Sequence, residues 1–236
     1  MSATQYHIGL LLYPDLTQLD LTGPYQVFAF LPNTQVHLLW KVLEPVSSSE
    51  GLSILPTMTF EQCPVLDVLC VPGGAIGHVN MMRDQELLHF LQQQGKTAKY
   101  ITSVCTGSLI LAAAGLLQGY RAGCHWAFRD QLAMLGVEVA TERIVIDRNR
   151  ITGGGVTAGI DFGLSIAAIL AGEETAKVIQ LLLEYNPAPP FDAGSPETAG
   201  EAIVQRFNQL GKRLQAASLA QTRETAARLG LSIQKN

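Results

Sequence analysis

The chain has 236 residues, of which 47% are hydrophobic and 15% are charged. This much apolar material with so little charge excludes a disordered chain and predicts a packed globular protein. The length fits one large α/β domain or two small domains equally well, and we take one domain as the working hypothesis. The net charge of −4 gives no basic footprint for nucleic acid. The longest apolar run, residues 109–117, is shorter than the roughly 20 residues that cross a bilayer, so no membrane span is predicted.

The cysteines and the N-terminus bear on the compartment. The polar first residues lead directly into a strand-like run, without the pattern of a signal peptide. Four cysteines, Cys63, Cys70, Cys105 and Cys124, occur without a C-x-x-C pair, which argues against a disulfide framework and a zinc site. Cys70 lies in an apolar run and is predicted to be a buried hydrophobe. We expect a cytoplasmic protein.

The first third of the chain begins with a strand. Residues 7–13 form a continuous apolar run closed by Pro14, the pattern of a strand buried on both faces. Thr22-Gly23-Pro24 supplies a cap and an early proline, and predicts the start of a short helix. Residues 36–42 are a second strand candidate. Residues 47–59, punctuated by turn residues, predict a hairpin or an edge excursion.

The middle of the chain holds two sharp strand ends. The apolar strand 66–71 stops at Pro72-Gly73-Gly74, a turn without bulky side chains. The β-branched strand 100–104 runs directly into Cys105 and then into a helical segment at 109–114. Further helices are predicted at 84–94 and 125–135.

The last third continues the alternation of strands and helices. Short strands are predicted at 138–139, 144–146 and 150–152, and apolar or amphipathic helices at 160–171 and 173–184. From Pro196 onward, one or two charged amphipathic helices are expected.

The order of these elements predicts the fold and the place of the site. Strands that are apolar throughout, alternating with helices, indicate a mostly parallel sheet with helices on both faces. Ligands bind such sheets at the carboxyl ends of the strands. The chain segments after Tyr13, Val71 and Val104 are therefore the candidates for a functional site.

Cys105 stands between a buried strand and a helix, which is a position for a nucleophile. The free N–H groups and the dipole of the helix N-terminus are expected to lower the pKa of the thiol, and the tight turn would project the sulfur as in a nucleophile elbow. The alternative is a small buried thiol that caps the strand. The local pattern does not decide between them.

Asp20 and the glycine turn are candidate partners of this thiol. Asp20 stands between two leucines, where a carboxylate is costly without a partner, although it is equally well interpreted as a helix cap. Gly73 and Gly74 offer backbone N–H groups for a developing negative charge, or form a plain turn. His125, beside Trp126, invites a Cys–His pairing but is more often a cap or packing residue. Residues 153–155 are glycines without a phosphate-binding spacing.

Several segments together resemble the ThiJ/PfpI superfamily. They are Pro72-Gly73-Gly74, Ser103-Val104-Cys105-Thr106-Gly107, and residues 121–126 and 157–161. Residues 18–24, 151–155 and 185–196 are most similar to one branch, the bacterial isonitrile (isocyanide) hydratases. The resemblance covers most of the chain.

This resemblance implies a flavodoxin-like three-layer sandwich. Residues 1–195 would be the ThiJ/PfpI-like (class I glutamine amidotransferase-like) domain, and residues 196–236 a helical extension packed on it, in a homodimer. Cys105 would be the nucleophile. The acidic partner, a Glu in many relatives, would here be Asp20. Thr106 stands where the peptidase-like branch has a His, which argues against a peptidase.

The resemblance also implies an activity. The chain would be a lyase (hydro-lyase) that hydrates isonitriles to N-substituted formamides through a cysteine thioimidate, with no metal or cofactor. Thr106, Gly73 and Gly74 would hold the polar end of the intermediate, and His125, Trp126 and Gly154 would form the substrate pocket. The alternatives are another cysteine-dependent hydrolase, a glyoxalase-like enzyme, or a thiol-based redox or ligand sensor. AraC-type regulators share some of these motifs but carry a helix-turn-helix module, for which the residues after Pro196 are too few.

Overall fold

A seven-stranded sheet forms the centre of the molecule. The computed structural model describes residues 5–231. In spatial order the strands are β10 (Ile144–Asp147), β11 (Arg150–Gly153), β7 (Tyr100–Val104), β6 (Val68–Val71), β1 (Tyr6–Leu11), β2 (Thr34–Trp40) and β5 (Met58–Thr59). All neighbouring strands pair in parallel except β10 with β11. The α/β fold with a mostly parallel sheet is therefore confirmed.

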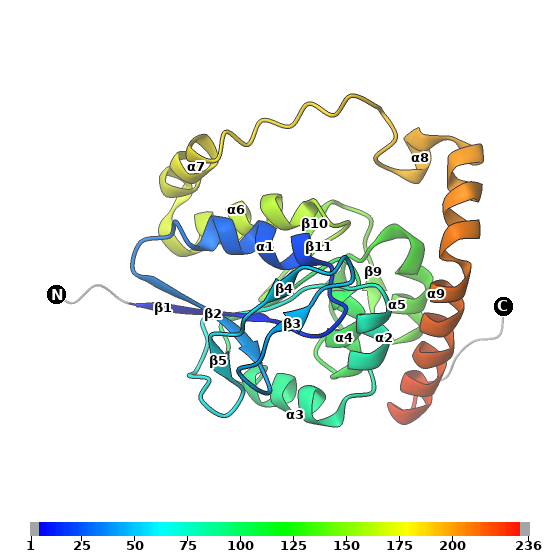
Figure 1. Ribbon diagram of the computed structural model, residues 1–236, viewed down its shortest axis with the longest axis horizontal. Coiled ribbons are helices and arrows are strands. Elements are labelled where there is room, and N and C mark those ends of the chain that lie inside the picture. The colour runs from blue at the N-terminus through cyan, green and yellow to red at the C-terminus, as the bar shows by residue number, and fades with distance from the viewer. Residues whose placement is uncertain (1–4, 232–236) are drawn as a thin grey trace.

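Helices cover both faces of this sheet. Figure 1 shows α1 (Gln18–Phe28) and α6 (Ala158–Ala171) together on one face, and α2 (Ile76–Met81), α3 (Gln85–Gln94) and α4 (Gly107–Ala113) on the other. With both faces covered, the central strands are apolar throughout: every residue of β6 is buried, and four of the five in β7.

The helix expected from Thr22 begins one turn earlier. α1 starts at Gln18, so that Asp20 lies in its first turn and Pro24 in its interior. The N–H of Thr17 donates to Gly73 O, 3.0 Å away, and this contact directs the chain into the helix. Local cap residues therefore do not set this start.

Smaller elements complete the fold. The segment 47–59 forms the predicted hairpin, β3 (Val46–Ser47) with β4 (Ser53–Ile54), and then adds β5 to the sheet edge. The helix expected at 125–135 is divided into a 3-10 turn, η1 (Trp126–Phe128), and α5 (Arg129–Met134). β8 (Arg121–Ala122) pairs with β9 (Glu138–Val139). The sequence did not predict α2 or β8, which are too short to show a periodic pattern.

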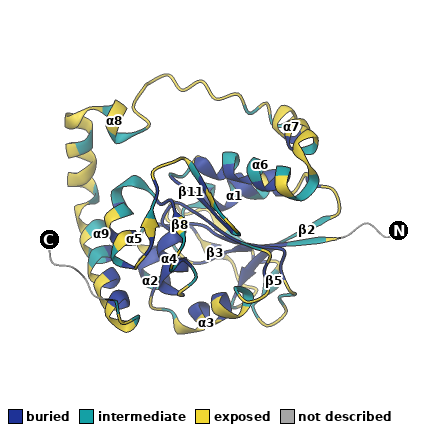
Figure 2. Ribbon diagram, turned by 180° about the vertical axis from the view of Figure 1, so that it is seen from behind, coloured by how far each residue is buried: buried dark blue, intermediate teal, exposed yellow. Residues whose placement is uncertain are grey.

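The C-terminal part of the chain returns to the body through a long connection. After α7 (Glu173–Leu182), an exposed segment passes over α6 and ends at α8 (Pro196–Ala199) (Figure 1). The long helix α9 (Glu201–Arg228) follows and runs along the side of the molecule. The first half of α9 is largely exposed, whereas the second half packs against α2, α4 and α5 (Figure 2). Ser218, Thr222 and Ala226 are fully buried there.

None of the helices between residues 5 and 231 has the length and apolar character needed to cross a membrane.

Candidate active site

Three adjacent strands bring the predicted site residues together. β7, β6 and β1 are neighbours in the sheet and run in the same direction. Their carboxyl ends lead to Cys105, to the turn at Gly73 and to α1 with Asp20, respectively. Residues far apart in the sequence therefore meet at one sheet edge, as the topology of parallel sheets requires.

Cys105 occupies a strained turn between β7 and α4. Its φ is 58°, in the left-handed region that side chains other than glycine rarely adopt, and such strain costs about 1–2 kcal/mol. The N–H of Cys105 donates to Gly153 O, 3.1 Å away, which fixes the turn. Gly107 permits it, because a Cβ there would overlap the carbonyl oxygen of Val71. The geometry is that of a nucleophile elbow.

Asp20 lies beside this thiol and is shielded from water. Its side chain is 0% exposed, and Oδ2 accepts a hydrogen bond from the N–H of Gly73, 2.9 Å away. Within the described part of the chain, Oδ1 is buried without an N–H or O–H donor. The Cys105 thiol is close enough to the carboxyl group for each of the two to shift the pKa of the other.

Burial dominates the electrostatics of this pair. It raises the pKa of Asp20 from 3.8 to about 7, although the Gly73 N–H and the Cys105 thiol counteract the shift. Burial also raises the pKa of Cys105 well above its ordinary value, with a further contribution from the nearby Asp20 charge. The expectation that the helix N-terminus lowers this pKa is therefore wrong in its net sign. The N–H of Thr106 favours the thiolate but is outweighed.

The N–H groups of Gly73 and Gly74 are already engaged. Gly73 donates to Asp20, and Gly74 donates to Oγ1 of Thr106, 3.0 Å away. The Thr106 hydroxyl in turn donates to Gly74 O, 3.2 Å away. In this state neither glycine has a free donor for an oxyanion, and both instead hold the acid and the residue after the nucleophile in place.

A small pocket opens above the thiol. Its volume is about 190 Å³, and Cys105, Thr106, Gly74 and His125 line it. The rest of its wall is mostly apolar and comes from five parts of the chain: Thr17, Ala75, Phe128, Val156, and Phe207, Gly211, Leu214 and Gln215. The last four residues belong to α9, so the C-terminal helix closes the site.

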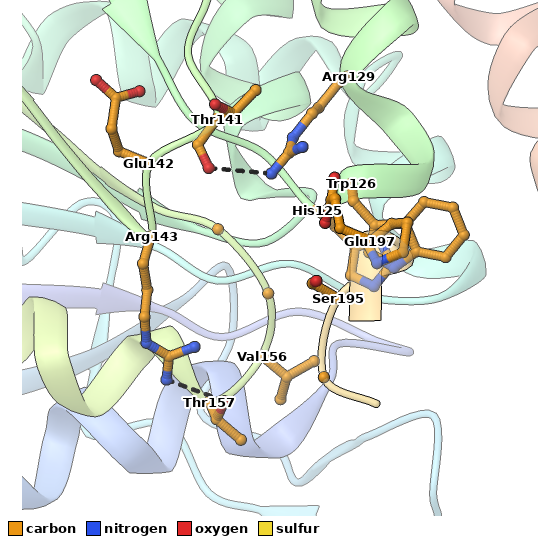
Figure 3. A pocket seen from close by; sticks show the side chains of 14 residues that line it. His125, Trp126, Arg129, Thr141, Glu142, Arg143, Val156, Thr157, Ser195 and Glu197 are labelled. Carbon is orange, nitrogen blue, oxygen red and sulfur yellow. Dashed lines mark hydrogen bonds between the residues drawn. The ribbon is translucent and has the colours of Figure 1, made fainter. Parts of the chain in front are cut away.

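Two predicted pocket residues lie elsewhere. Trp126 and Gly154 line a larger neighbouring hollow of about 530 Å³, not the pocket above Cys105. That hollow is polar: Figure 3 shows Arg129 bonded to the backbone of Thr141, and Arg143 reaching Thr157. This hollow adjoins the pocket above Cys105 and shares His125 and Val156 with it, so Trp126 and Gly154 lie next to that pocket without lining it. Trp126 packs instead on Phe207, with ring centroids 4.7 Å apart.

His125 lines both hollows as a neutral ring. Burial and the charge of Arg129 lower its pKa to about 4. Its Nδ1 accepts a hydrogen bond from the N–H of Ala127, 3.3 Å away, so it caps η1. Its ring also stacks near Phe207, with centroids 6.0 Å apart. This environment suits a wall residue better than a proton carrier near neutral pH.

The other thiols are less suited to chemistry. Cys70 and Cys124 are fully buried, and burial raises the pKa of each to about 12. Cys63 is half-buried, with its pKa raised to about 11. Among residues 5–231, no group of three His, Cys, Asp or Glu side chains is placed to hold a metal ion.

The contribution of α9 was missed in the sequence. Phe207 and Leu214 are seven residues apart and therefore lie on one helix face, a spacing that signals an apolar stripe. No local sequence pattern shows that this stripe faces Cys105, which lies far earlier in the chain.

The raised pKa of Asp20 predicts a pH-dependent stability. Between about pH 4 and pH 7, Asp20 keeps its proton in the folded protein but has lost it in the unfolded chain. As the pH rises through this range, the free energy of unfolding therefore falls by about 1.4 kcal/mol per pH unit. Asp20→Asn removes this pH-dependent loss of stability, and the Asn side chain can still accept the hydrogen bond from the N–H of Gly73. Urea unfolding should show the variant more stable than the parent at pH 8, with the gap closing toward pH 4. The matched control is Asp130→Asn at an exposed site on α5; a gap independent of pH would contradict the assignment.

Comparisons with known proteins agree with this geometry. The DJ-1/PfpI family model matches residues 7–169. Isonitrile hydratase of Pseudomonas putida is 55% identical over 95% of this chain and 98% of that protein. The HTH-type transcriptional regulator GbdR of Pseudomonas aeruginosa is 33% identical over 76% of this chain, but over 50% of the regulator. The crystal structure of a ThiJ/PfpI family protein from Pseudomonas syringae, 46% identical, superposes with a TM-score of 0.90 over 93% of this chain and 91% of the other. The chain belongs to the DJ-1/PfpI family, as its motifs predicted.

Proposed function

We propose that this protein is an isonitrile hydratase, a lyase that adds water to R–N≡C and releases the N-substituted formamide. The observation that carries the proposal is the buried pair of Cys105 and Asp20, of which Cys105 lines a small and mostly apolar pocket. The identity of 55% to the hydratase of Pseudomonas putida, over nearly the full length of both proteins, supports it.

The first step is the addition of the thiol. Because burial holds the pKa of Cys105 high, the sulfur attacks the isonitrile carbon as Asp20 removes its proton. With a pKa of about 7, Asp20 is able both to accept this proton and to return it to the same carbon. The product is a covalent thioimidate, R–N=CH–S–Cys105. No net charge is created in the buried site.

The second step is hydrolysis of the thioimidate. Asp20 takes a proton from water as the water oxygen bonds to the carbon, and passes that proton to the imine nitrogen, which gives R–NH–CH(OH)–S–Cys105. The C–S bond then breaks, the hydroxyl proton passes through Asp20 to sulfur, and R–NH–CHO leaves. The N–H of Thr106, which faces the sulfur, stabilises the departing thiolate.

The shape of the pocket favours a compact apolar substituent. Phe128, Val156, Phe207 and Leu214 provide apolar walls within about 190 Å³. Burial of an alkyl group against them supplies binding energy of roughly 25 cal/mol per Å² of apolar surface. In the neighbouring hollow, by contrast, apolar side chains such as Trp126 alternate with the charged Arg129, Glu142 and Arg143.

A thiol sensor is less well supported. A thiol that is readily oxidised by peroxide requires a low pKa and exposure. Cys105 is 6% exposed, and burial raises its pKa. An acid–base partner with a pKa of about 7 is what an enzyme needs, because a proton can then move in both directions.

We further propose that the protein acts in the cytoplasm as a homodimer. The four cysteines are all unpaired, as in a reducing compartment. Exposed apolar side chains, Val178, Leu181 and Leu182, line α7, and Phe191 lies on the exposed segment that follows. A second copy would cover such a surface. Light scattering after size exclusion should give twice the chain mass; a monomer at micromolar concentration would contradict the dimer.

Substitutions at the pair test the chemistry. Cys105→Ala should reduce formamide production from cyclohexyl isonitrile by at least about 1,000-fold, because the covalent route is lost. Asp20→Asn keeps the contact with Gly73 but carries no proton, and should reduce kcat comparably. Gas chromatography or NMR of the formamide measures both. Cys70→Ala is the matched control, with a buried thiol removed elsewhere on the sheet. Near-parental turnover by Cys105→Ala would exclude the thioimidate.

The position of the substituent is tested from α9. Leu214→Trp fills the pocket above Cys105 and should raise KM for cyclohexyl isonitrile about tenfold or more, with a smaller effect for methyl isonitrile. Leu210→Trp on the same helix is the control, since Leu210 is 80% exposed and lines neither hollow. Equal effects of the two variants, or of the two substrates, would place the substituent elsewhere.

A further inference from the structure

His78 is a buried polar residue that the proposed chemistry does not use. It lies on α2, directly after the glycine turn, and is 0% exposed. It does not line the pocket, but its ring packs edge-on against Phe128, which does, with centroids 5.3 Å apart. A fully buried imidazole is costly unless both ring nitrogens have partners.

One ring nitrogen holds the catalytic turn. Nδ1 lies 2.7 Å from Gly74 O and 2.6 Å from Ala75 O, so it carries a proton and donates it to these carbonyls. The Gly74 peptide unit also exchanges two hydrogen bonds with the Thr106 hydroxyl, and the preceding N–H holds Asp20. The position of this imidazole therefore bears on both residues beside the nucleophile.

The other ring nitrogen holds α9. Nε2 lies 2.8 Å from Oγ of Ser218, which is 0% exposed. Ser218 Oγ also donates to Oε1 of the Gln131 side chain on α5, 2.5 Å away, and Thr222 donates to the same oxygen at 3.2 Å. Burial lowers the pKa of His78 and so favours the neutral ring, in which the single Ser218 hydrogen lies between two acceptors, Nε2 of His78 and Oε1 of Gln131.

We propose that His78 is a positioning residue that ties the docking of α9, through Ser218, to the Gly73–Ala75 turn that holds Asp20 and Thr106. The wall of the pocket and its catalytic floor are thus set by one imidazole bridge. α9 supplies Phe207 and Leu214 to the wall, one to three turns before Ser218. The turn supplies the contact that orients the acid. A shift of either one displaces the other.

The bridge makes α9 part of the catalytic apparatus and not only a cover. A rigid bridge matters because misplacing a catalytic group by about 1 Å costs as much as 100-fold in rate. This inference rests on the proposed function for its turnover readout. A second readout, the rate at which iodoacetamide alkylates Cys105, depends on the arrangement of Cys105, Asp20, the turn and the α9 wall, and needs no isonitrile turnover.

Two substitutions cut the bridge on the α9 side. Ser218→Ala removes the partner of Nε2, and His78→Asn keeps a donor near the Nδ1 position but does not reach Ser218. Each should lower kcat about tenfold and change the pH profile of Cys105 alkylation, followed by peptide mass. The double variant should be no worse than either single variant, because both remove the same contact.

Thr222→Val is the matched control. Thr222 is also 0% exposed, lies one turn further along α9 and bonds to the same Gln131 amide, but does not contact His78. It should lower the stability measured by urea unfolding about as much as Ser218→Ala, while kcat and the alkylation profile stay near parental values. Circular dichroism confirms that each variant is folded at the assay temperature.

The outcomes separate the two proposals. If Ser218→Ala and Thr222→Val lower kcat and shift alkylation equally, His78 has only a structural role in docking α9, and the inference is wrong. It is also wrong if Ser218→Ala changes neither readout. If the parent protein hydrates no isonitrile, the proposed function fails, but a shifted alkylation profile confined to Ser218→Ala and His78→Asn still supports the bridge.

Discussion

The burial of one carboxyl group beside one thiol is the constraint on which the site depends. Removal from water raises the pKa of Asp20 to about 7, although the N–H of Gly73 and the thiol of Cys105 partly oppose this shift. The same burial keeps the thiol protonated. A proton can therefore pass between sulfur, carboxyl and substrate without leaving a charge unpaired in an apolar pocket, which would be costly. The raised pKa of Asp20 that permits this proton transfer also lowers the stability of the folded protein above about pH 4.

The surrounding structure serves to hold that pair. The left-handed turn at Cys105 requires the close approach of α4 to β6 that Gly107 allows. The N–H groups of Gly73 and Gly74 donate to Asp20 and Thr106, respectively. His78 donates from Nδ1 to the carbonyl of Gly74 in the same turn. A helix from the end of the chain closes the pocket above. The site is thus built from three strand ends and one distant helix.

Much of this could be predicted from local patterns, and particular residues show where such patterns stop. Apolar runs identified β1, β6 and β7, and the strand–turn–helix pattern at Cys105 identified the nucleophile position. The start of α1 was predicted wrongly because a contact between Thr17 and Gly73, not a cap, sets it. The family resemblance assigned Trp126 and Gly154 to the substrate pocket, whereas in the structure they line the hollow beside the pocket above Cys105.

The sequence by itself determined the fold class and the family, because these depend on periodic patterns and short motifs, and through the family resemblance it predicted Cys105 as nucleophile and Asp20 as its acidic partner. Only the tertiary structure decided the sign of the thiol pKa shift, since burial is a property of the whole packing and here exceeds the local effect of a helix N-terminus. Only the tertiary structure decided that α9 walls the pocket and that His78 joins it to the catalytic turn. Those contacts connect residues 140 positions apart in the chain, between His78 and Ser218, and no local pattern encodes them.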